Sequence, residues 1–263
     1  MCCDRSRTRG GPEPARAGSA ALLFLIALFL VGVLSGGTAA VVGFGIGSLL
    51  TPLVAARYDA QTAVGIVALP HLLATAVRFV QHRTAIDRDV LLRFGVPSAI
   101  GGLAGAMLQG RFSSPALLAV LGGLLLATGI ANLTGGFGGW RPDSHATPAL
   151  GMLSGFFGGL AGNQGGLRTA GLSAFTLPPR AFLATSTAVA LLVDLARTPI
   201  YLTRAGGTLF QLAGPIAVAA IGCLVGTVLG ERILIGTTPE RYRRVVGAAV
   251  ALVGLWLLAP WSR

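Results

Sequence analysis

Forty consecutive residues near the N-terminus, from Ala17 to Ala56, contain no Asp, Glu, Lys or Arg. A membrane crossing needs only about 20 apolar residues, and a straight helix of this length would measure about 60 Å, roughly twice the thickness of the hydrocarbon layer. The segment is also rich in glycine between Gly32 and Gly47, and each glycine destabilises a helix interior by about 1 kcal/mol relative to alanine. The sequence therefore predicts a membrane-embedded segment whose helix breaks at GFGIG, residues 43–47.

The rest of the chain has the same character. It is 53% hydrophobic and only 11% charged, whereas soluble domains usually carry about 25% charged residues. The net charge of +11 comes from arginine alone. These arginines lie mostly between apolar runs or at their ends, where positive charge sets membrane orientation, so they do not indicate nucleic-acid binding. The fold class we predict is an all-α polytopic membrane protein.

The chain repeats itself at an offset of 119 residues. GVLSG at 32–36 aligns with GMLSG at 151–155, Arg78 aligns with Arg197, and 11 of the 47 positions from 32 to 78 are identical. At an offset of 121, GGLAGAMLQGRF at 101–112 aligns with GCLVGTVLGERI at 222–233. The first apolar run thus belongs to the mature fold and is not a cleaved signal peptide. We expect close helix packing at four small residues of the second match: Gly101, Gly105, Gly222 and Gly226.

We expect about eight transmembrane helices in two homologous four-helix repeats with glycine-rich breaks. The expected units are a basic cytoplasmic N-terminal tail (1–19), repeat 1 (20–135), a linker (136–146), repeat 2 (147–260) and a C-terminal tail (261–263). The expected spans are 20–42, 60–81, 91–110, 115–134, 148–162, 181–203, 208–230 and 241–260. The positive-inside rule places the N-terminus and the 82–93 loop in the cytoplasm. An even number of crossings per repeat would make the repeats parallel and an odd number inverted; the sequence leaves this open.

Broken helices at matching positions of two repeats are typical of the substrate site of a secondary transporter. Unwound backbone is tolerated in a membrane only where protein or a water-filled cavity satisfies it, and the N-terminus of a restarting helix favours an anion. The alternative is close packing through small residues. The candidate binding residues at the two breaks are Gly43, Gly45, Gly47, Gly162, Asn163, Gln164, Gly165 and Gly166.

Four ionisable residues inside apolar runs are further candidates. Arg78 and Arg197 match between the repeats, and a guanidinium binds oxyanions through two hydrogen bonds; snorkelling of the side chain to the interface is the alternative. Asp194 lies one turn before Arg197, so it either neutralises this arginine or carries a coupling proton. His71 is either a satisfied buried histidine or a proton relay.

No catalytic motif is present: the chain lacks GxSxG, HExxH, a P-loop and a cofactor-binding cysteine set. The three cysteines have no metal-binding spacing. We therefore predict no enzyme activity, no catalytic residues, no metal and no cofactor.

The LSG lead-in to a glycine-rich break, the helix starting near AQTAVGIVALPHLLATAVR and its repetition as RAFLATSTAVALLVDLAR resemble the sulfite exporter TauE/SafE family of bacterial membrane permeases. The resemblance covers about residues 20–260. It implies an eight-span carrier built from a duplicated four-span unit. It also implies export or uptake of sulfite, sulfoacetate or other small organosulfur or carboxylate anions.

The sequence thus predicts a multi-pass secondary transporter of the cell inner (plasma) membrane. We expect its partners to be the lipid bilayer and a small anion, sulfite or an organosulfonate, moved by alternating access between the two repeats. The driving force would be a proton or the membrane potential. A channel-like or cation-conducting protein and a non-transporting membrane assembly subunit remain alternatives, and a homo-oligomer is left open. We expect no nucleic-acid partner.

Overall fold

The computed structural model describes residues 13–135, 143, 145–233 and 239–259, and within them every regular element is a helix. The elements are α1 (Glu13–Val42), α2 (Ile46–Ala55), α3 (Ala60–His82), η1 (Arg83–Ala85), α4 (Arg88–Val90), η2 (Leu91–Gly95), α5 (Val96–Gln109), α6 (Ser114–Leu133), α7 (Thr147–Ala161), α8 (Gly165–Leu172), α9 (Pro179–Gln211), α10 (Ala213–Ile233) and α11 (Pro239–Leu258). The predicted all-α class is confirmed. Most of the predicted tail 1–19, most of the linker 136–146 and the tail 261–263 lie outside the described residues.

Six helical segments in the described part are long and apolar enough to cross a membrane: Gly18–Val42, Ala60–Ala85, Arg88–Gln109, Ser114–Leu133, Pro179–Gln211 and Ala213–Gly230. The two other predicted spans correspond to α7, which has only 15 residues, and to α11, which carries three arginines near its start. Eight crossings therefore stay a prediction. The helix expected over 181–203 is longer than predicted, because α9 continues to Gln211 through a kink at Ala205.

Both helix breaks have α-helical segments on either side. α2 follows the break after α1, and α8 follows the break after α7, in the two stretches that the predicted spans left unassigned. α1 and α7 end, α2 and α8 begin, and α3 and α9 begin at positions that are 119 residues apart in each pair. The helix boundaries therefore coincide with the offset of the sequence match.

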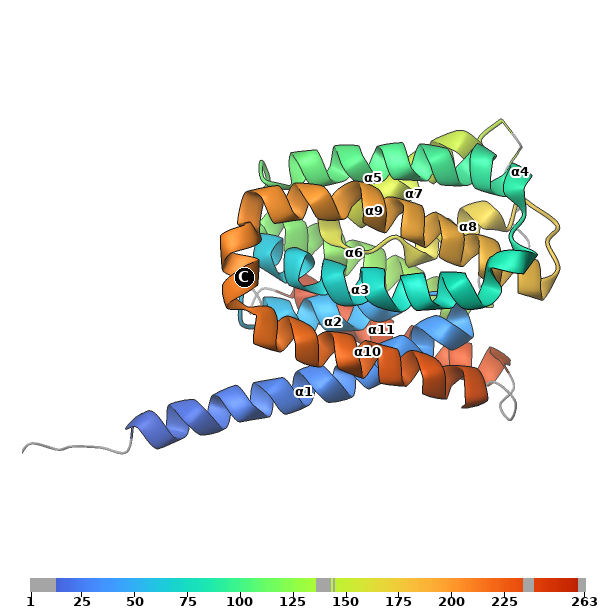
Figure 1. Ribbon diagram of the computed structural model, residues 1–263. Coiled ribbons are helices and arrows are strands. Elements are labelled where there is room, and N and C mark those ends of the chain that lie inside the picture. The colour runs from blue at the N-terminus through green and yellow to red at the C-terminus, as the bar shows by residue number, and fades with distance from the viewer. Residues whose placement is uncertain (1–12, 136–142, 144, 234–238, 260–263) are drawn as a thin grey trace, which may run out of the picture.

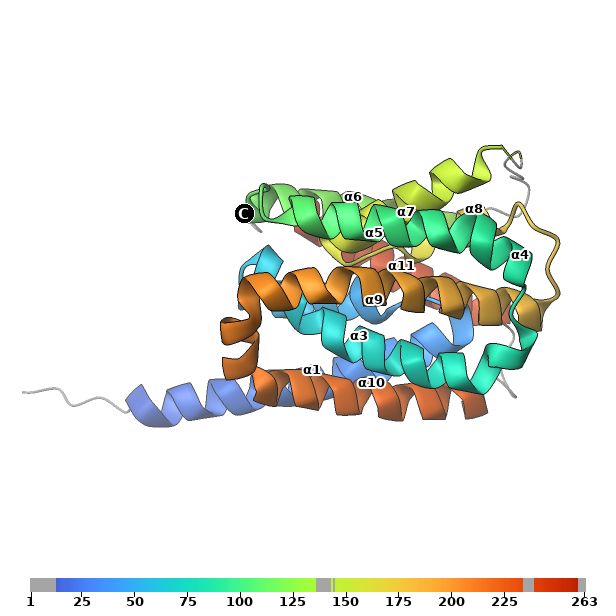
Figure 2. The ribbon, with the colours of Figure 1, turned by 45° about the horizontal axis from the view of Figure 1, so that its top comes forward.

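The long helices lie side by side, and they run in both directions between the two ends of the molecule (Figures 1 and 2). α1 and α3 both begin at one end of the molecule, whereas α7 and α9 both begin at the other end. α11 ends at the same end at which α1 begins. The connection from α3 to α5 lies at the opposite end of the helices from the start of α1, so the membrane side of each end stays a prediction.

Glycines allow three helix pairs to pack closely: α1 with α10, α5 with α7, and α6 with α11. A Cβ on Gly226 of α10 would lie 2.0 Å from the carbonyl oxygen of Val33, and one on Gly105 of α5 would lie 2.1 Å from that of Phe156. Gly101 and Gly222 meet backbone in the same way. The predicted packing role of these four glycines is confirmed, and it follows the small-residue rule for helices in membranes.

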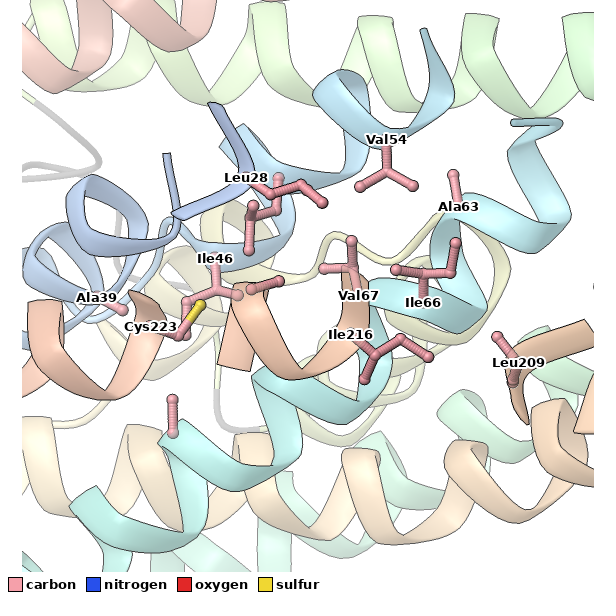
Figure 3. Close-up of a cluster of buried hydrophobic side chains, with 13 residues drawn as sticks. Leu28, Ala39, Ile46, Val54, Ala63, Ile66, Val67, Leu209, Ile216 and Cys223 are labelled. Carbon is pink, nitrogen blue, oxygen red and sulfur yellow. The ribbon is translucent and has the colours of Figure 1, made fainter. Parts of the chain in front are cut away.

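A buried apolar cluster fixes the first break in place (Figure 3). α2 contributes Ile46, Leu50 and Val54, which are four residues apart and therefore share one helix face. They pack with residues of α1, α3, α9 and α10, among them Leu28, Val67, Leu209, Ile216 and Cys223. Because this face of α2 is anchored in the cluster, its N-terminus is held toward the centre of the molecule.

Candidate functional site

The two helix breaks touch each other. Gly45 has φ 146° and Gly162 has φ 75°, a region of backbone conformation that favours glycine. A Cβ added to Gly47 would lie 2.1 Å from the carbonyl oxygen of Gly162, and one on Gly165 would lie 2.2 Å from the Cβ of Phe44. The backbone of one break is thus packed directly on the other, although the two are more than a hundred residues apart in the chain.

A small cavity lies between the breaks. It is lined by Phe44, Gly45, Gly47, Ser48, His71, Gly162, Asn163, Gln164, Gly165 and Arg168. The structure therefore brings seven of the sequence-predicted residues into one wall: Gly45, Gly47, His71, Gly162, Asn163, Gln164 and Gly165. The other predicted residues do not line it in this conformation: Gly43, Arg78, Gly166, Asp194 and Arg197.

Arg168 on α8 is the charged group of this wall and is only 3% exposed. Its Nη2 donates to the carbonyl oxygen of Gly43 at 2.8 Å and its Nε donates to Ser186 Oγ at 3.0 Å. Its Nη1 is buried and has no hydrogen-bond partner. In the part of the chain that the structure describes, no carboxylate lies within ion-pair distance of Arg168. A buried cation with only neutral partners is energetically costly.

Two amide side chains in the same wall as Arg168 also have polar atoms without a hydrogen-bond partner. Asn163 and Gln164 are buried, and Asn163 Nδ2 and both polar atoms of Gln164 make no hydrogen bond. Asn163 Oδ1 accepts from the backbone N–H of Gly165 at 3.3 Å. An unsatisfied buried polar group costs about 1–3 kcal/mol. Three unused donors, one of them charged, therefore line the same small cavity, which suits a ligand rich in hydrogen-bond acceptors.

A second polar cluster joins α3 to α9 behind the cavity. Asp194 is fully buried, and its Oδ1 accepts from Arg197, with Nη2 at 2.8 Å and Nε at 3.0 Å. Its Oδ2 lies 2.6 Å from His71 Nδ1, and the Thr75 hydroxyl lies 3.3 Å from the same nitrogen. Asp194 therefore forms an ion pair with Arg197 and also connects this pair to His71, which lines the cavity.

The last carbonyls of α7 are held by side chains of α9. Arg197 Nη1 donates to the carbonyl oxygen of Gly158, and the Tyr201 hydroxyl donates to that of Gly159. Carbonyl groups at a helix C-terminus have no partner within the helix. The Gly158 oxygen also accepts from the N–H of Gly162 at 3.1 Å, and the Gly159 oxygen is satisfied by Tyr201. Arg78, on α3, is also buried and lies close enough to Arg168 for the two charges to repel.

The family model of the sulfite exporter TauE/SafE family matches residues 28–257, which include both breaks and the cavity between them. The chain belongs to the TauE/SafE family. The family is one of membrane transporters of sulfur-containing anions rather than one of enzymes. No curated protein and no solved structure matched the chain.

Sequence reasoning missed Arg168, together with Phe44, Ser48 and Ser186. Arg168 had a visible signal, because it is the only Asp, Glu, Lys or Arg between residues 144 and 179, and a charge inside an apolar run suggests function. It was overlooked because its counterpart at the 119-residue offset is Leu49, so the search for repeat-matched arginines passed over it. Nothing in the sequence distinguishes Ser48 and Ser186 from other small polar residues of the helices.

Proposed function

We propose that the protein is a secondary transporter of a small anion, a sulfur oxyanion or an organosulfonate, in the bacterial inner membrane, and that the anion binds in the cavity between the two breaks. The observation that carries this proposal is Arg168, a buried guanidinium beside the cavity. Its Nη1 is unused, and it has no carboxylate partner among the described residues. Asn163 and Gln164 supply further donors from the same wall.

An anion would relieve the electrostatic cost of this arrangement. Asp194 is near enough to attract Arg168, but its two oxygens are already bound by Arg197 and His71. A bound oxyanion would give Arg168 the counter-charge it lacks. The first-turn N–H groups of α2 and α8, which begin at Ile46 and Gly165, add positive potential at the cavity because a helix N-terminus favours negative charge.

The other predicted arginines have supporting roles in this proposal. Arg78 adds a second buried positive charge near Arg168, which raises the potential felt by an anion. Arg197 acts through Asp194 and through the end of α7 rather than through direct contact in this conformation. A cation-conducting protein is less well supported, because Asp194, the fully buried carboxylate in the described residues, is already neutralised.

For the transport cycle we propose alternating access between two inverted repeats. Three kinds of observation support inverted repeats. Helix boundaries recur at the 119-residue offset. α1 packs on α10, and the helices at equivalent positions of the other repeat, α7 and α5, pack on each other in the same way. The starts of α1 and α3 lie at the opposite end from those of α7 and α9, as an odd number of crossings per repeat requires. Because the breaks meet at the centre, movement of one repeat against the other would open the cavity to alternate sides.

Flux into proteoliposomes tests the proposal, with sulfite, sulfate, thiosulfate, sulfoacetate, taurine and acetate as probes. We expect at least one sulfur anion to move, and Arg168→Gln to reduce its flux by about a hundredfold or more, because a charged hydrogen-bond donor to the anion is lost from a water-poor site. Arg168→Lys keeps the charge without the paired donors and should retain part of the flux.

Arg93→Gln is the matched control, since Arg93 is an exposed arginine paired with Asp89, and its flux should equal that of the unaltered protein. If Arg168→Gln is folded and transports normally, the site is elsewhere. If no anion moves under a proton gradient or an imposed potential, the non-transporting subunit becomes the better hypothesis.

A further inference from the structure

His71 connects the cavity to a carboxylate that has no contact with the cavity itself. The imidazole lines the cavity, and its Nδ1 lies 2.6 Å from Oδ2 of the fully buried Asp194. The carboxylate is held ionised by Arg197, so it accepts the hydrogen bond and Nδ1 carries the hydrogen. The ring nitrogen that remains to take up a proton is Nε2.

We infer that His71 is the proton-coupling group of the transporter and that it lets the site accept a divalent anion together with one proton. The inference rests on the proposed anion site at Arg168. As the anion enters, a hydronium ion of the aqueous phase gives a proton to the Nε2 lone pair, so one O–H bond breaks and one N–H bond forms. As the anion leaves on the other side, the N–H bond breaks and the proton returns to water.

The charges around the cavity account for this stoichiometry. Arg197 and Asp194 neutralise each other, and Arg168 is the arginine that lines the cavity. Arg78 is buried near Arg168 but does not line the cavity. Within the wall, a monovalent anion is balanced by Arg168 alone. A divalent anion leaves one negative charge uncompensated, and protonation of His71 supplies the missing positive charge within the same wall. An Asp–His pair suits this role, because the carboxylate stabilises the imidazolium that forms.

The surroundings of His71 contain few other groups that could carry the proton. From α9, Asp194 contacts His71 directly and Arg197 lies behind it; from α8, Arg168 lines the same cavity. α2 and α6, which pack against α3, contain no ionisable side chain. α10 carries Glu231 and Arg232 near its C-terminal end, and α3 itself carries Arg78. Arginine stays protonated at physiological pH, so His71 is the group able to change charge beside the cavity.

The test compares two probes in proteoliposomes that contain a pH-sensitive dye: sulfoacetate, which carries two negative charges near neutral pH, and methanesulfonate, which carries one. We expect about one proton to enter with each sulfoacetate and none with methanesulfonate. With His71→Gln, sulfoacetate flux near pH 6.5 should fall about tenfold or more. The remaining sulfoacetate flux should carry no proton and should not depend on pH. Methanesulfonate flux should change less than about threefold, because only the second negative charge of the anion needs the imidazolium.

Thr75→Val is the matched control. The Thr75 hydroxyl touches the same Nδ1 but cannot hold the proton, so this variant should keep the proton stoichiometry. Proton-coupled sulfoacetate flux that persists in His71→Gln overturns the inference. Sulfoacetate that crosses without a proton, or methanesulfonate flux without any sulfoacetate flux, also overturns it but leaves the proposed anion transport intact. If neither probe moves, nor any anion of the preceding experiment, both proposals fail.

Discussion

The two helix breaks occupy equivalent places in the chain and differ in chemistry. The first, at 43–45, presents Phe44 and Gly45 to the cavity; the second, at 162–164, presents Asn163 and Gln164 at the equivalent positions. The helix after the first break has Leu49 where the helix after the second has Arg168. The polar and charged donors therefore come almost entirely from the second break, whereas the first contributes backbone, an aromatic ring and Ser48.

If the chain is a duplication, as proposed, this difference separates what both copies keep from what one copy adds to the proposed site. Both breaks have the two features that the backbone needs there: a glycine that allows the turn, and a helix that restarts at the same offset. Only one copy carries the charge. Two buried guanidiniums facing each other across a cavity of this size would repel strongly in a low-dielectric interior. One arginine and one apolar counterpart leave room for a single anion, so the asymmetry is part of the proposed binding chemistry.

The largest effect should come from substitutions that separate the breaks. Gly47 and Gly166 are equivalent in the repeats, but a Cβ on Gly47 would meet the backbone oxygen of Gly162, whereas one on Gly166 would meet the Thr128 hydroxyl, both at 2.1 Å. A side chain can move more easily than a backbone. We therefore expect Gly47→Ala to destabilise the fold by about 3 kcal/mol or more and Gly166→Ala by about 1 kcal/mol, measured as thermal unfolding of the purified protein in detergent.

Gly37→Ala is the control for this pair. Its Cβ would have the oxygen of Gly226 at 3.4 Å as its nearest neighbour, an ordinary contact, and alanine is the better helix former. This variant should be as stable as the unaltered protein or slightly more stable. Equal destabilisation by Gly47→Ala and Gly166→Ala would contradict the contact between the breaks.

A smaller effect, of opposite sign for stability and transport, is expected at Gln164. Both polar atoms of its amide are buried without partners, so Gln164→Met keeps the volume and removes an unsatisfied group. The thermal midpoint in the absence of anion should rise by a few degrees, corresponding to about 1 kcal/mol. Anion flux should fall about tenfold, because a donor to the ligand is lost.

Phe44→Leu makes the corresponding change in the first break, and it should lower flux by less than about threefold because no hydrogen-bond donor is lost. If Gln164→Met lowers stability and leaves flux unchanged, the amide is a structural group with a partner in solution, and the cavity wall is not the binding site.

Much of this comparison could be predicted from the sequence. The uncharged run from Ala17 to Ala56 is too long for one crossing, which required a break, and the repeated GVLSG and GMLSG segments located its counterpart. Helix ends are local features, set by glycine and by the length of apolar runs, and local features are readable from sequence. The role of Arg168 could not be read in this way, because its importance depends on Gly43 and Ser186, which lie far away in the chain.

The match between the two halves of the chain is a poor guide to the charge that lines the cavity. Arg78 and Arg197 match, but Arg197 is bound to Asp194 and to the end of α7. Matching residues in a duplicated fold are preserved by shared packing as readily as by shared chemistry. The unmatched charge was the better indicator, since packing alone gives no reason to bury one arginine in only one of two equivalent helices.

The smallest effect in this series concerns how each break is held. The end of α7 is bound by two side chains of α9, Arg197 and Tyr201, whereas the Gly43 carbonyl after α1 is bound by Arg168. Tyr201→Phe removes one neutral hydrogen bond from the second break and leaves Arg197 in place. We expect a loss of about 1 kcal/mol in stability, seen as a thermal midpoint lower by a few degrees, and a flux within about twofold of the unaltered protein, because the hydroxyl does not line the cavity. A flux as low as that of Arg168→Gln would mean that holding the end of α7 is itself a step of transport, and the division between a structural bond at Tyr201 and a binding group at Arg168 would have to be abandoned.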